Sequence, residues 1–281
     1  MLAERITDRV AFHGEGPVWS DGWGGLRWVD MLAGAVLRLR EDGCVERREL
    51  GGIVAAIRPR RGGGAVLGVE RGFALEDGAG AVTRLGDLWE GGDVRMNEGA
   101  CDPEGRFYCG SMALDQRKGG GALYRLSPDG AVETVLDSVT MSNGLDWAPD
   151  GSRAFYNDTA TRRVDVFDYD RTRGLTGRRV FVDLSGEDLR PDGLTVDSEG
   201  GVWVALSNGG AVRRYTPAGK LDGVVELPTT KVTACTFGGP NLDQLFITTS
   251  REGQDPEDPI AGSLFRADVR VQGRPVRDFA G

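Results

Sequence analysis

Four oxygen-bearing side chains recur at a nearly constant distance before a predicted turn. Asn97, Asn143 and Asp192 each lie eight residues before a turn glycine, and Glu15 lies seven residues before one. Two carboxylates and two amides brought together would offer only hard oxygen donors, which suit Ca²⁺, Mg²⁺, Mn²⁺ or Zn²⁺. Asn-Gly and Asp-Gly are also common turn dipeptides, but four such positions in register favour a divalent metal site.

A sequence repeat supplies the elements that would position these side chains. Four segments share a polar turn followed by an aromatic or β-branched strand, and two weaker copies precede them; the segments begin at Ala100, Trp147, Thr195 and Phe237, and the weaker copies at Val18 and Ile57. The turn glycines, at positions 22, 62, 105, 151, 200 and 239, are 40, 43, 46, 49 and 39 residues apart. A period of about 40–50 residues is typical of β-propeller blades.

The strand pattern within a repeat supports the same architecture. Residues 121–136 read as two alternating strands joined by a Ser-Pro-Asp-Gly turn, and residues 34–50 and 210–227 repeat this hairpin pattern. No segment has the 3.6-residue period of a helix. Six blades of about 45 residues would fill the chain, whereas a β-helix has shorter repeats and two β-sandwiches would not keep this period. We predict an all-β fold, a single six-bladed β-propeller domain of four-stranded blades over residues 1–281.

The propeller places equivalent positions of different blades at equal depth around a central channel. The position before each innermost strand would therefore direct Glu15, Asn97, Asn143 and Asp192 toward the axis, in a central metal-binding channel. Alternation along the strand turns Glu98 away from the face of Asn97. Residues 5–12 are expected to add a strand to the last blade and close the ring.

Composition excludes several classes of function. The chain has 281 residues, 34 basic and 43 acidic, for a net charge of −9, which disfavours nucleic acid as a partner. No apolar run approaches the roughly 18–20 residues that span a bilayer, and the N-terminus lacks the apolar stretch of a secretory signal. We expect a cytoplasmic protein with no membrane partner. A closed propeller hides its own sheet edges, so a monomer or weak homo-oligomer is expected.

Other sites of known chemistry are missing. His13 is the only histidine, so H-E-x-x-H zinc sites are absent, and neither a G-x-S-x-G elbow nor a G-x-x-x-x-G-K-[ST] phosphate loop occurs. His13 lies two residues from Glu15 and is expected to support that residue by a hydrogen bond or by packing, not to bind metal. No C-x-x-C pair occurs, and all four cysteines are predicted to be buried free thiols; they are Cys44, Cys101, Cys109 and Cys235.

Several segments, in order along nearly the whole chain, resemble the senescence marker protein/gluconolactonase family of regucalcin-like sugar lactonases. They are GEGPVW (14–19), LRWVDM (26–31), RMNEGACDPEGRFYCGSM (95–112), GALYRL (121–126), MSNGLDWAPDG (141–151) and RPDGLTVDSEGGVWVA (190–205). The resemblance implies a six-bladed propeller with one divalent metal ion (Ca, Zn, Mg, Mn or Fe) in its channel. It also implies a small-molecule sugar lactone as substrate.

The resemblance assigns roles residue by residue. The Glu of GEGP, the Asn of SNGL and the Asp of PDGL are metal ligands in this family, which implies Glu15, Asn143 and Asp192 here. Asp192 is also the implied catalytic residue, as acceptor of a proton from water. The R-x-N motif implies that Arg95 and Asn97 bind substrate.

One departure concerns substrate recognition. The family has a substrate-binding Glu shortly before the GALY-type strand, and this chain has none there. Direct counting puts Arg117 in its place, and Asp115 is the nearest carboxylate and our substrate-binding candidate. The predicted function is metal-dependent opening of aldonolactones to aldonic acids. The alternatives are a propeller hydrolase of organophosphates or other esters, and a non-catalytic calcium-binding propeller.

Overall fold

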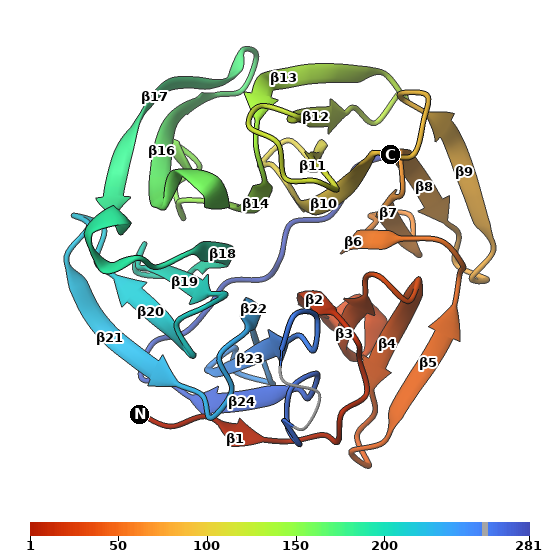
Figure 1. Cartoon of the computed structure of the whole chain (residues 1–281). Helices are drawn as coiled ribbons and strands as arrows, with labels where there is room; N and C mark the ends of the chain where they lie inside the picture. Colours follow the sequence, from red (N-terminus) through yellow and green to blue (C-terminus); the bar gives the residue numbers. More distant parts are fainter. Residues whose placement is uncertain (255–257) are drawn as a thin grey trace.

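Six antiparallel sheets of four strands each form blades around a central axis (Figure 1). The computed structural model describes residues 1–254 and 258–281. Within those ranges the chain contains three short 3-10 turns and no α-helix, so no helix is available that is long and apolar enough to cross a membrane. The all-β, six-bladed prediction is confirmed.

Five blades are continuous in sequence, and each runs from the innermost to the outermost strand in chain order. Their strands are β2 (Gly14–Ser20), β3 (Gly25–Asp30), β4 (Ala35–Leu39) and β5 (Val45–Glu49); β6 (Val54–Pro59), β7 (Ala65–Val69), β8 (Gly72–Glu76) and β9 (Val82–Asp87); β10 (Val94–Cys101), β11 (Phe107–Ala113), β12 (Gly121–Leu126) and β13 (Val132–Val139); β14 (Ser142–Trp147), β15 (Arg153–Asp158), β16 (Arg163–Asp170) and β17 (Gly174–Asp183); and β18 (Pro191–Val196), β19 (Val202–Leu206), β20 (Ala211–Tyr215) and β21 (Leu221–Glu226).

The last blade joins the two ends of the chain. It consists of β22 (Val232–Gly238), β23 (Gln244–Thr249), β24 (Phe265–Asp268) and, as its outermost strand, β1 (Glu4–Arg5). Glu4 pairs with Arg266 and Arg5 with Phe265. The N-terminal strand therefore closes the ring as predicted, although it has two residues and begins one residue before the expected range.

A β-bulge interrupts the innermost strand of every blade at the same depth. The register shifts lie between Glu15 and Val18, Val54 and Ala56, Met96 and Gly99, Ser142 and Leu145, Pro191 and Leu194, and Val232 and Ala234. Bulges re-aim side chains next to binding sites. The predicted position before the innermost strand is therefore wrong by a few residues, because the recurring polar residues lie inside that strand, at its bulge.

The core lies between neighbouring blades. Strands β7, β11 and β19 are buried along their whole length, and large aromatic side chains such as Trp147 and Tyr108 pack edge to face between blades. Burying one such side chain stabilises the fold by roughly 1.5–3 kcal/mol. This packing holds the six inner strands, and therefore the residues at their bulges, in a rigid ring.

The C-terminal segment after β24 crosses the far end of the channel (Figure 1). It contacts the inner end of four blades in turn, through Ser198 N–H to Gln272 O (2.9 Å), Arg274 to Trp147 O (2.7 Å), Ala280 N–H to Gly105 O (2.8 Å) and Phe279 N–H to Pro59 O (2.8 Å). We call residues 270–281 the C-terminal strap. It covers one end of the channel and leaves the other end for a ligand.

Three cysteines are buried free thiols as predicted, namely Cys101, Cys109 and Cys235, but Cys44 is exposed. Cys44 follows the turn that joins β4 to β5, the outer hairpin of the first blade. Its backbone N–H donates to Asp42 Oδ1 at 3.0 Å. The prediction is wrong for Cys44 because the outermost strand of a blade has no further blade packed against it.

Candidate metal and substrate site

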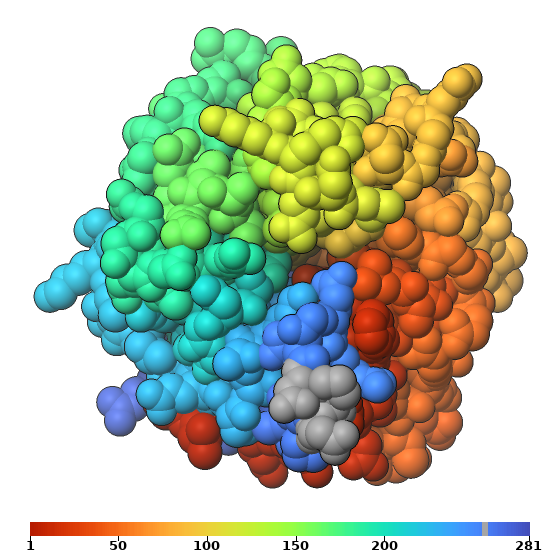
Figure 2. All heavy atoms as spheres, viewed as in Figure 1, coloured from red at the N-terminus to blue at the C-terminus, as the bar shows by residue number. Residues whose placement is uncertain are grey.

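A cavity of about 350 Å³ occupies the end of the channel opposite the C-terminal strap. Figure 2 views the molecule from this end, where the yellow-green loop after β11 and the blue loop after β23 border the centre of the ring. Five of the six predicted site residues line this one cavity: Glu15, Arg95, Asn97, Asn143 and Asp192. They come from four different inner strands, so only the closed ring brings them together.

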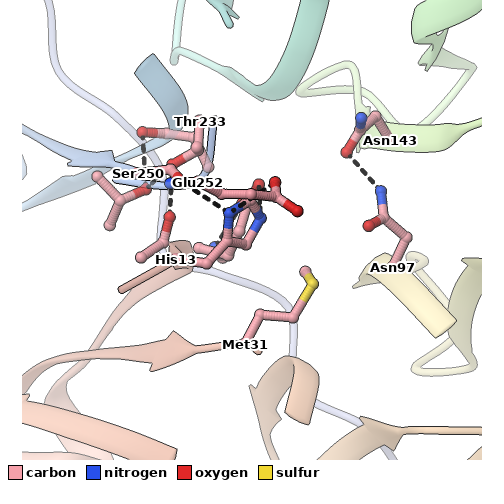
Figure 3. A network of polar contacts seen from close by, with 12 residues as sticks. His13, Met31, Asn97, Asn143, Thr233, Ser250 and Glu252 are labelled. Atoms are coloured by element: carbon pink, nitrogen blue, oxygen red, sulfur yellow. Dashed lines mark hydrogen bonds and ion pairs between the residues drawn. The ribbon is translucent and has the colours of Figure 1, made fainter. Parts of the chain in front are cut away.

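A hydrogen-bond chain fixes the orientation of the Asn143 amide. The Thr159 hydroxyl donates to Pro191 O at 2.7 Å. Its oxygen therefore accepts from Asn143 Nδ2, which lies 2.8 Å away. Because the amide nitrogen is committed to Thr159, Oδ1 of Asn143 is the atom turned toward the cavity, where it accepts from Asn97 Nδ2 at 2.9 Å (Figure 3).

The same chain continues to Arg95. Asn97 Nδ2 also donates to Ser142 O at 2.7 Å, and Asn97 Oδ1 accepts from the Arg95 guanidinium at 2.6 Å. Arg95 further donates to Met96 O and contacts the sulfur of Met31, each at 3.0 Å. Arg95 is buried, and its acceptors among residues 1–254 and 258–281 are all neutral. The position of its guanidinium is therefore set by hydrogen bonds and not by an ion pair.

Glu15 and Asp192 are two buried carboxylates that repel each other. Their exposed fractions are 3% and 7%. Burial raises the pKa of each, repulsion from Asp192 further raises the pKa of Glu15, and repulsion from Glu98 raises the pKa of both. Gly16 N–H is 3.0 Å from Glu15 Oε2 and opposes the shift only in part. Two carboxylates in this environment are stabilised by a proton or by a cation between them.

The donor set fits a divalent cation. Glu15 and Asp192 supply two carboxylates, and Asn143 supplies a carbonyl oxygen whose direction is fixed. In the part of the chain that the structure describes, His, Cys, Asp and Glu side chains alone form no group of three suited to a metal, so the amide is needed to complete the set. Oxygen-only ligands of this kind suit Ca²⁺, Mg²⁺ or Mn²⁺.

His13 lies on the opposite side of the cavity from Asn97 and Asn143 (Figure 3). Its Nδ1 is 2.7 Å from Ser250 Oγ, and its Nε2 is 3.9 Å from Glu15 Oε1. Burial lowers the pKa of His13 to about 4, so the imidazole is neutral at pH 7. His13 thus adds no charge to the site, and its ring packs against the Glu15 side chain.

The segment that departs from the family pattern contains Asp115, Gln116 and Arg117. One of these three residues lines the cavity. The Asp115 side chain is 62% exposed and pairs with Arg117 at 3.1 Å, while Arg117 also pairs with Asp93 at 2.6 Å. Neither Asp115 nor Arg117 lines the cavity, but Gln116 does. Gln116 has a left-handed backbone with φ of 55° in the turn after β11, which direct counting along the sequence does not reveal.

Glu98 lies on the other side of β10 from Asn97, as alternation along the strand predicts. It lines a second, smaller cavity of about 50 Å³ under the C-terminal strap, together with Arg58, Cys101 and Cys235. Its Oε2 has no hydrogen-bond partner among the described residues. Burial raises the pKa of Glu98 to about 7.

Sequence reasoning did not find the polar residues at the mouth of the cavity. Lys231 and Glu252 line it as an ion pair with Nζ and Oε2 2.9 Å apart, and Arg190 and Ser207 line the wall next to Asp192. These residues lie outside the repeated motif, on connections whose course only the fold determines. The sequence feature that could have pointed to Arg190 is its position two residues before Asp192.

Comparisons with known proteins agree with this architecture. A family model described as the SMP-30/gluconolactonase/LRE-like region matches residues 13–251. Regucalcin of Danio rerio is 36% identical over 279 residues and pentonolactonase XacC of Haloferax volcanii is 36% identical over 292 residues; the matches cover 95% of both chains for the first, and 98% of this chain and 97% of that one for the second. A solved calcium-binding regucalcin from Agrobacterium tumefaciens has a TM-score of 0.91 at 27% identity, over 98% of this chain and 95% of that chain. Sequence, fold and motif order together place the chain in the SMP-30/gluconolactonase/LRE-like family.

Proposed function

We propose that this protein hydrolyses sugar lactones to aldonic acids with a divalent cation bound by Glu15, Asn143 and Asp192. The observation that carries the proposal is that these three oxygen donors line one cavity with Arg95 and Asn97. A cavity of this kind, with a few converging polar groups, suits a small molecule. A relative named as a pentonolactonase supports a sugar lactone as the substrate class.

When bound, a divalent cation supplies Lewis acidity toward the lactone carbonyl. Asp192 accepts a proton from the attacking water. Burial raises its pKa in the metal-free protein, and a bound cation would oppose that shift and favour the carboxylate form. Arg95 and Asn97 hold the sugar hydroxyls. Their mutual hydrogen bond and the bond from Asn97 to Asn143 keep substrate-binding and cation-binding groups in one fixed arrangement.

A calcium-binding protein without catalytic activity is the second candidate. The specific support is that a solved relative is described as calcium-binding. The same three oxygen donors would serve that role, so the cavity residues alone do not separate the two functions. Catalysis additionally requires that Arg95 and Asn97 bind a lactone, which a measurement of cation binding alone would not detect.

The proposal is tested by proton release from a panel of aldonolactones, using metal-stripped protein to which each divalent cation is returned separately. Uncatalysed ring opening is subtracted. We expect at least one cation to restore turnover on at least one lactone. Bound metal without turnover on any lactone, or on an organophosphate and ester panel, would contradict hydrolysis and leave the calcium-binding function.

A further inference from the structure

We propose that the substrate carries an acidic group at the end remote from the lactone carbonyl, and that Arg190 binds this group. This inference rests on the proposed lactone hydrolysis and specifies its substrate class. The acidic group is a terminal carboxylate, as in the lactone of a sugar diacid, or a phosphate. This role is supported by the position of Arg190, by the charge balance of the cavity and by a side pocket that Arg190 also lines.

The backbone of Arg190 is held in place by the loop after β19. Arg190 N–H donates to Asn208 Oδ1 at 2.8 Å, and Ser207 N–H donates to Arg190 O at 3.0 Å. Arg190 precedes Asp192 by two residues, and two residues of extended chain span about 6.6 Å. In a 1,5-lactone the ring oxygen joins the carbonyl carbon to C5, so three bonds of about 1.5 Å separate that carbon from C6 and the two lie about 4 Å apart. Because Arg190 and Asp192 line the same cavity, a lactone carbonyl near Asp192 places a group on C6 within reach of the Arg190 side chain.

The charges that line the cavity leave two guanidiniums without a partner. The described residues of the lining include three cations and three anions. Lys231 and Glu252 neutralise each other as an ion pair. Glu15 and Asp192 are the two carboxylates of the proposed cation site, where a divalent cation would neutralise both. Arg95 and Arg190 remain, and neither forms an ion pair with a carboxylate of the described residues.

A side pocket gives the acidic group room. About 160 Å³ of space adjoins the main cavity, and both are lined by Gln116, Met141, Thr159 and Arg190. Arg162 lies in the side pocket as well, but its guanidinium is 2.5 Å from Asp188 and is neutralised by it. Arg190 is therefore the guanidinium of the side pocket that is free to form charge-assisted hydrogen bonds with a carboxylate or phosphate.

A second role for Arg190, stabilisation of the reacting carbonyl, predicts a different dependence on the substrate. Positive charge near the reacting carbonyl also stabilises the oxyanion of the transition state, and that effect would act equally on neutral and acidic lactones. A subsite for an acidic group acts only on substrates that possess one. The ratio of kcat/KM for acidic and neutral lactones separates the two explanations.

The experiment compares glucono-1,5-lactone, 6-phosphogluconolactone and glucaro-1,4-lactone as substrates for the metal-loaded protein. We expect kcat/KM to be at least about tenfold higher for one acidic lactone than for the neutral one. Arg190→Gln should lower that ratio by about tenfold, and Arg190→Glu should lower it further. The matched control is Arg162→Gln, which removes a neutralised guanidinium from the same side pocket and should leave the ratio unchanged. The acidic lactone whose kcat/KM falls in Arg190→Gln identifies the acidic group as a carboxylate or a phosphate.

A direct binding measurement distinguishes failure of the inference from failure of the proposed function. Calorimetric titration with D-glucarate and D-gluconate compares a diacid with a monoacid without any turnover. Arg190→Gln should weaken binding of the diacid about tenfold more than that of the monoacid. Equal loss for all substrates, or no acidic preference in the unaltered protein, overturns the inference even if lactones are hydrolysed. Arg190-dependent diacid binding without turnover would instead overturn only the lactonase.

Discussion

Thr159 determines that the amide oxygen of Asn143, and not its nitrogen, points into the cavity. The Thr159 hydroxyl gives its only proton to Pro191 O at 2.7 Å, so its oxygen accepts from Asn143 Nδ2 at 2.8 Å. Thr159 comes from the short 3-10 turn after β15, and Pro191 begins the strand that carries Asp192. One hydroxyl thus links the amide of Asn143, through its Nδ2, to the strand of Asp192, across two neighbouring blades.

Replacing this hydroxyl should weaken the cation site. Thr159→Val keeps the side-chain shape but removes the acceptor for Asn143, so the amide is free to turn its nitrogen inward. Loss of such supporting hydrogen bonds typically costs about 10–100-fold in metal affinity. Titration of metal-stripped protein with Ca²⁺ or Mn²⁺ measures the change. Thr159→Ser retains the hydroxyl and should bind nearly as well; equal affinities for all three proteins would contradict this role.

Asp192→Asn should remove most of the hydrolytic activity. The substitution preserves size but eliminates both the proton acceptor and one of the two anionic donors, and loss of general base catalysis alone costs about 10²–10⁴-fold. Initial rates and bound metal are measured on the same samples. Asp183→Asn, on the exposed outer strand of the same half of the ring, is the control. Unchanged activity in Asp192→Asn would refute its catalytic role.

Gln116, and not Asp115, should affect substrate binding. Gln116 lines the cavity, whereas Asp115 is exposed and pairs with Arg117. Gln116→Ala removes a hydrogen-bonding group and should raise KM by roughly threefold to tenfold, in line with about 1 kcal/mol for a neutral hydrogen bond. Asp115→Ala should leave KM within error. The opposite order of effects would restore Asp115 as the substitute for the family's Glu.

Glu98→Gln should stabilise the metal-free protein, and more so as the pH rises. The folded-state pKa of Glu98 is about 7, against 4.5 for an unburied Glu. Below pH 4.5 Glu98 is protonated in both the folded and the unfolded state, so its ionisation does not affect the free energy of unfolding. Between pH 4.5 and 7 only the unfolded state ionises, so the native state loses stability, and above pH 7 the full cost is on the order of 3 kcal/mol.

Urea unfolding of both proteins at pH 5 and pH 8, with a chelator present, measures this difference. The gain from Glu98→Gln should be small at pH 5 and large at pH 8. Glu90→Gln, at a position exposed to solvent, should show no such dependence. A gain that stays constant with pH would mean that Glu98 does not titrate between the two states.

The C-terminal strap should contribute strongly to stability. Phe279 is 2% exposed and packs in the core cluster of the first three blades. Phe279→Ala should lower the free energy of unfolding by about 3–5 kcal/mol, the usual cost for a buried Phe. Leu221→Ala removes an exposed apolar side chain and should change it by less than about 0.5 kcal/mol. A small effect of Phe279→Ala would mean that the strap is not packed in solution.

The repeat in the sequence was enough to predict the architecture and the main candidates of the site. A blade is one local unit of four short strands, so its turns and alternation recur in the sequence and can be counted. The same repeat placed Glu15, Asn97, Asn143 and Asp192 at equivalent positions, and all four line one cavity. Position in a repeat predicts position around the axis because each blade contributes the same strand to the channel.

Tertiary structure decided the features that depend on contacts between blades or on irregular loops. The left-handed backbone of Gln116 decides that this residue, and not Asp115 or Arg117, reaches the cavity. The hydroxyl of Thr159 orients Asn143 across a blade boundary, which no spacing within one repeat encodes. Cys44 is exposed because an outer strand has no neighbour beyond it. Arg190 reaches the mouth of the cavity because a loop from the same blade holds its backbone there.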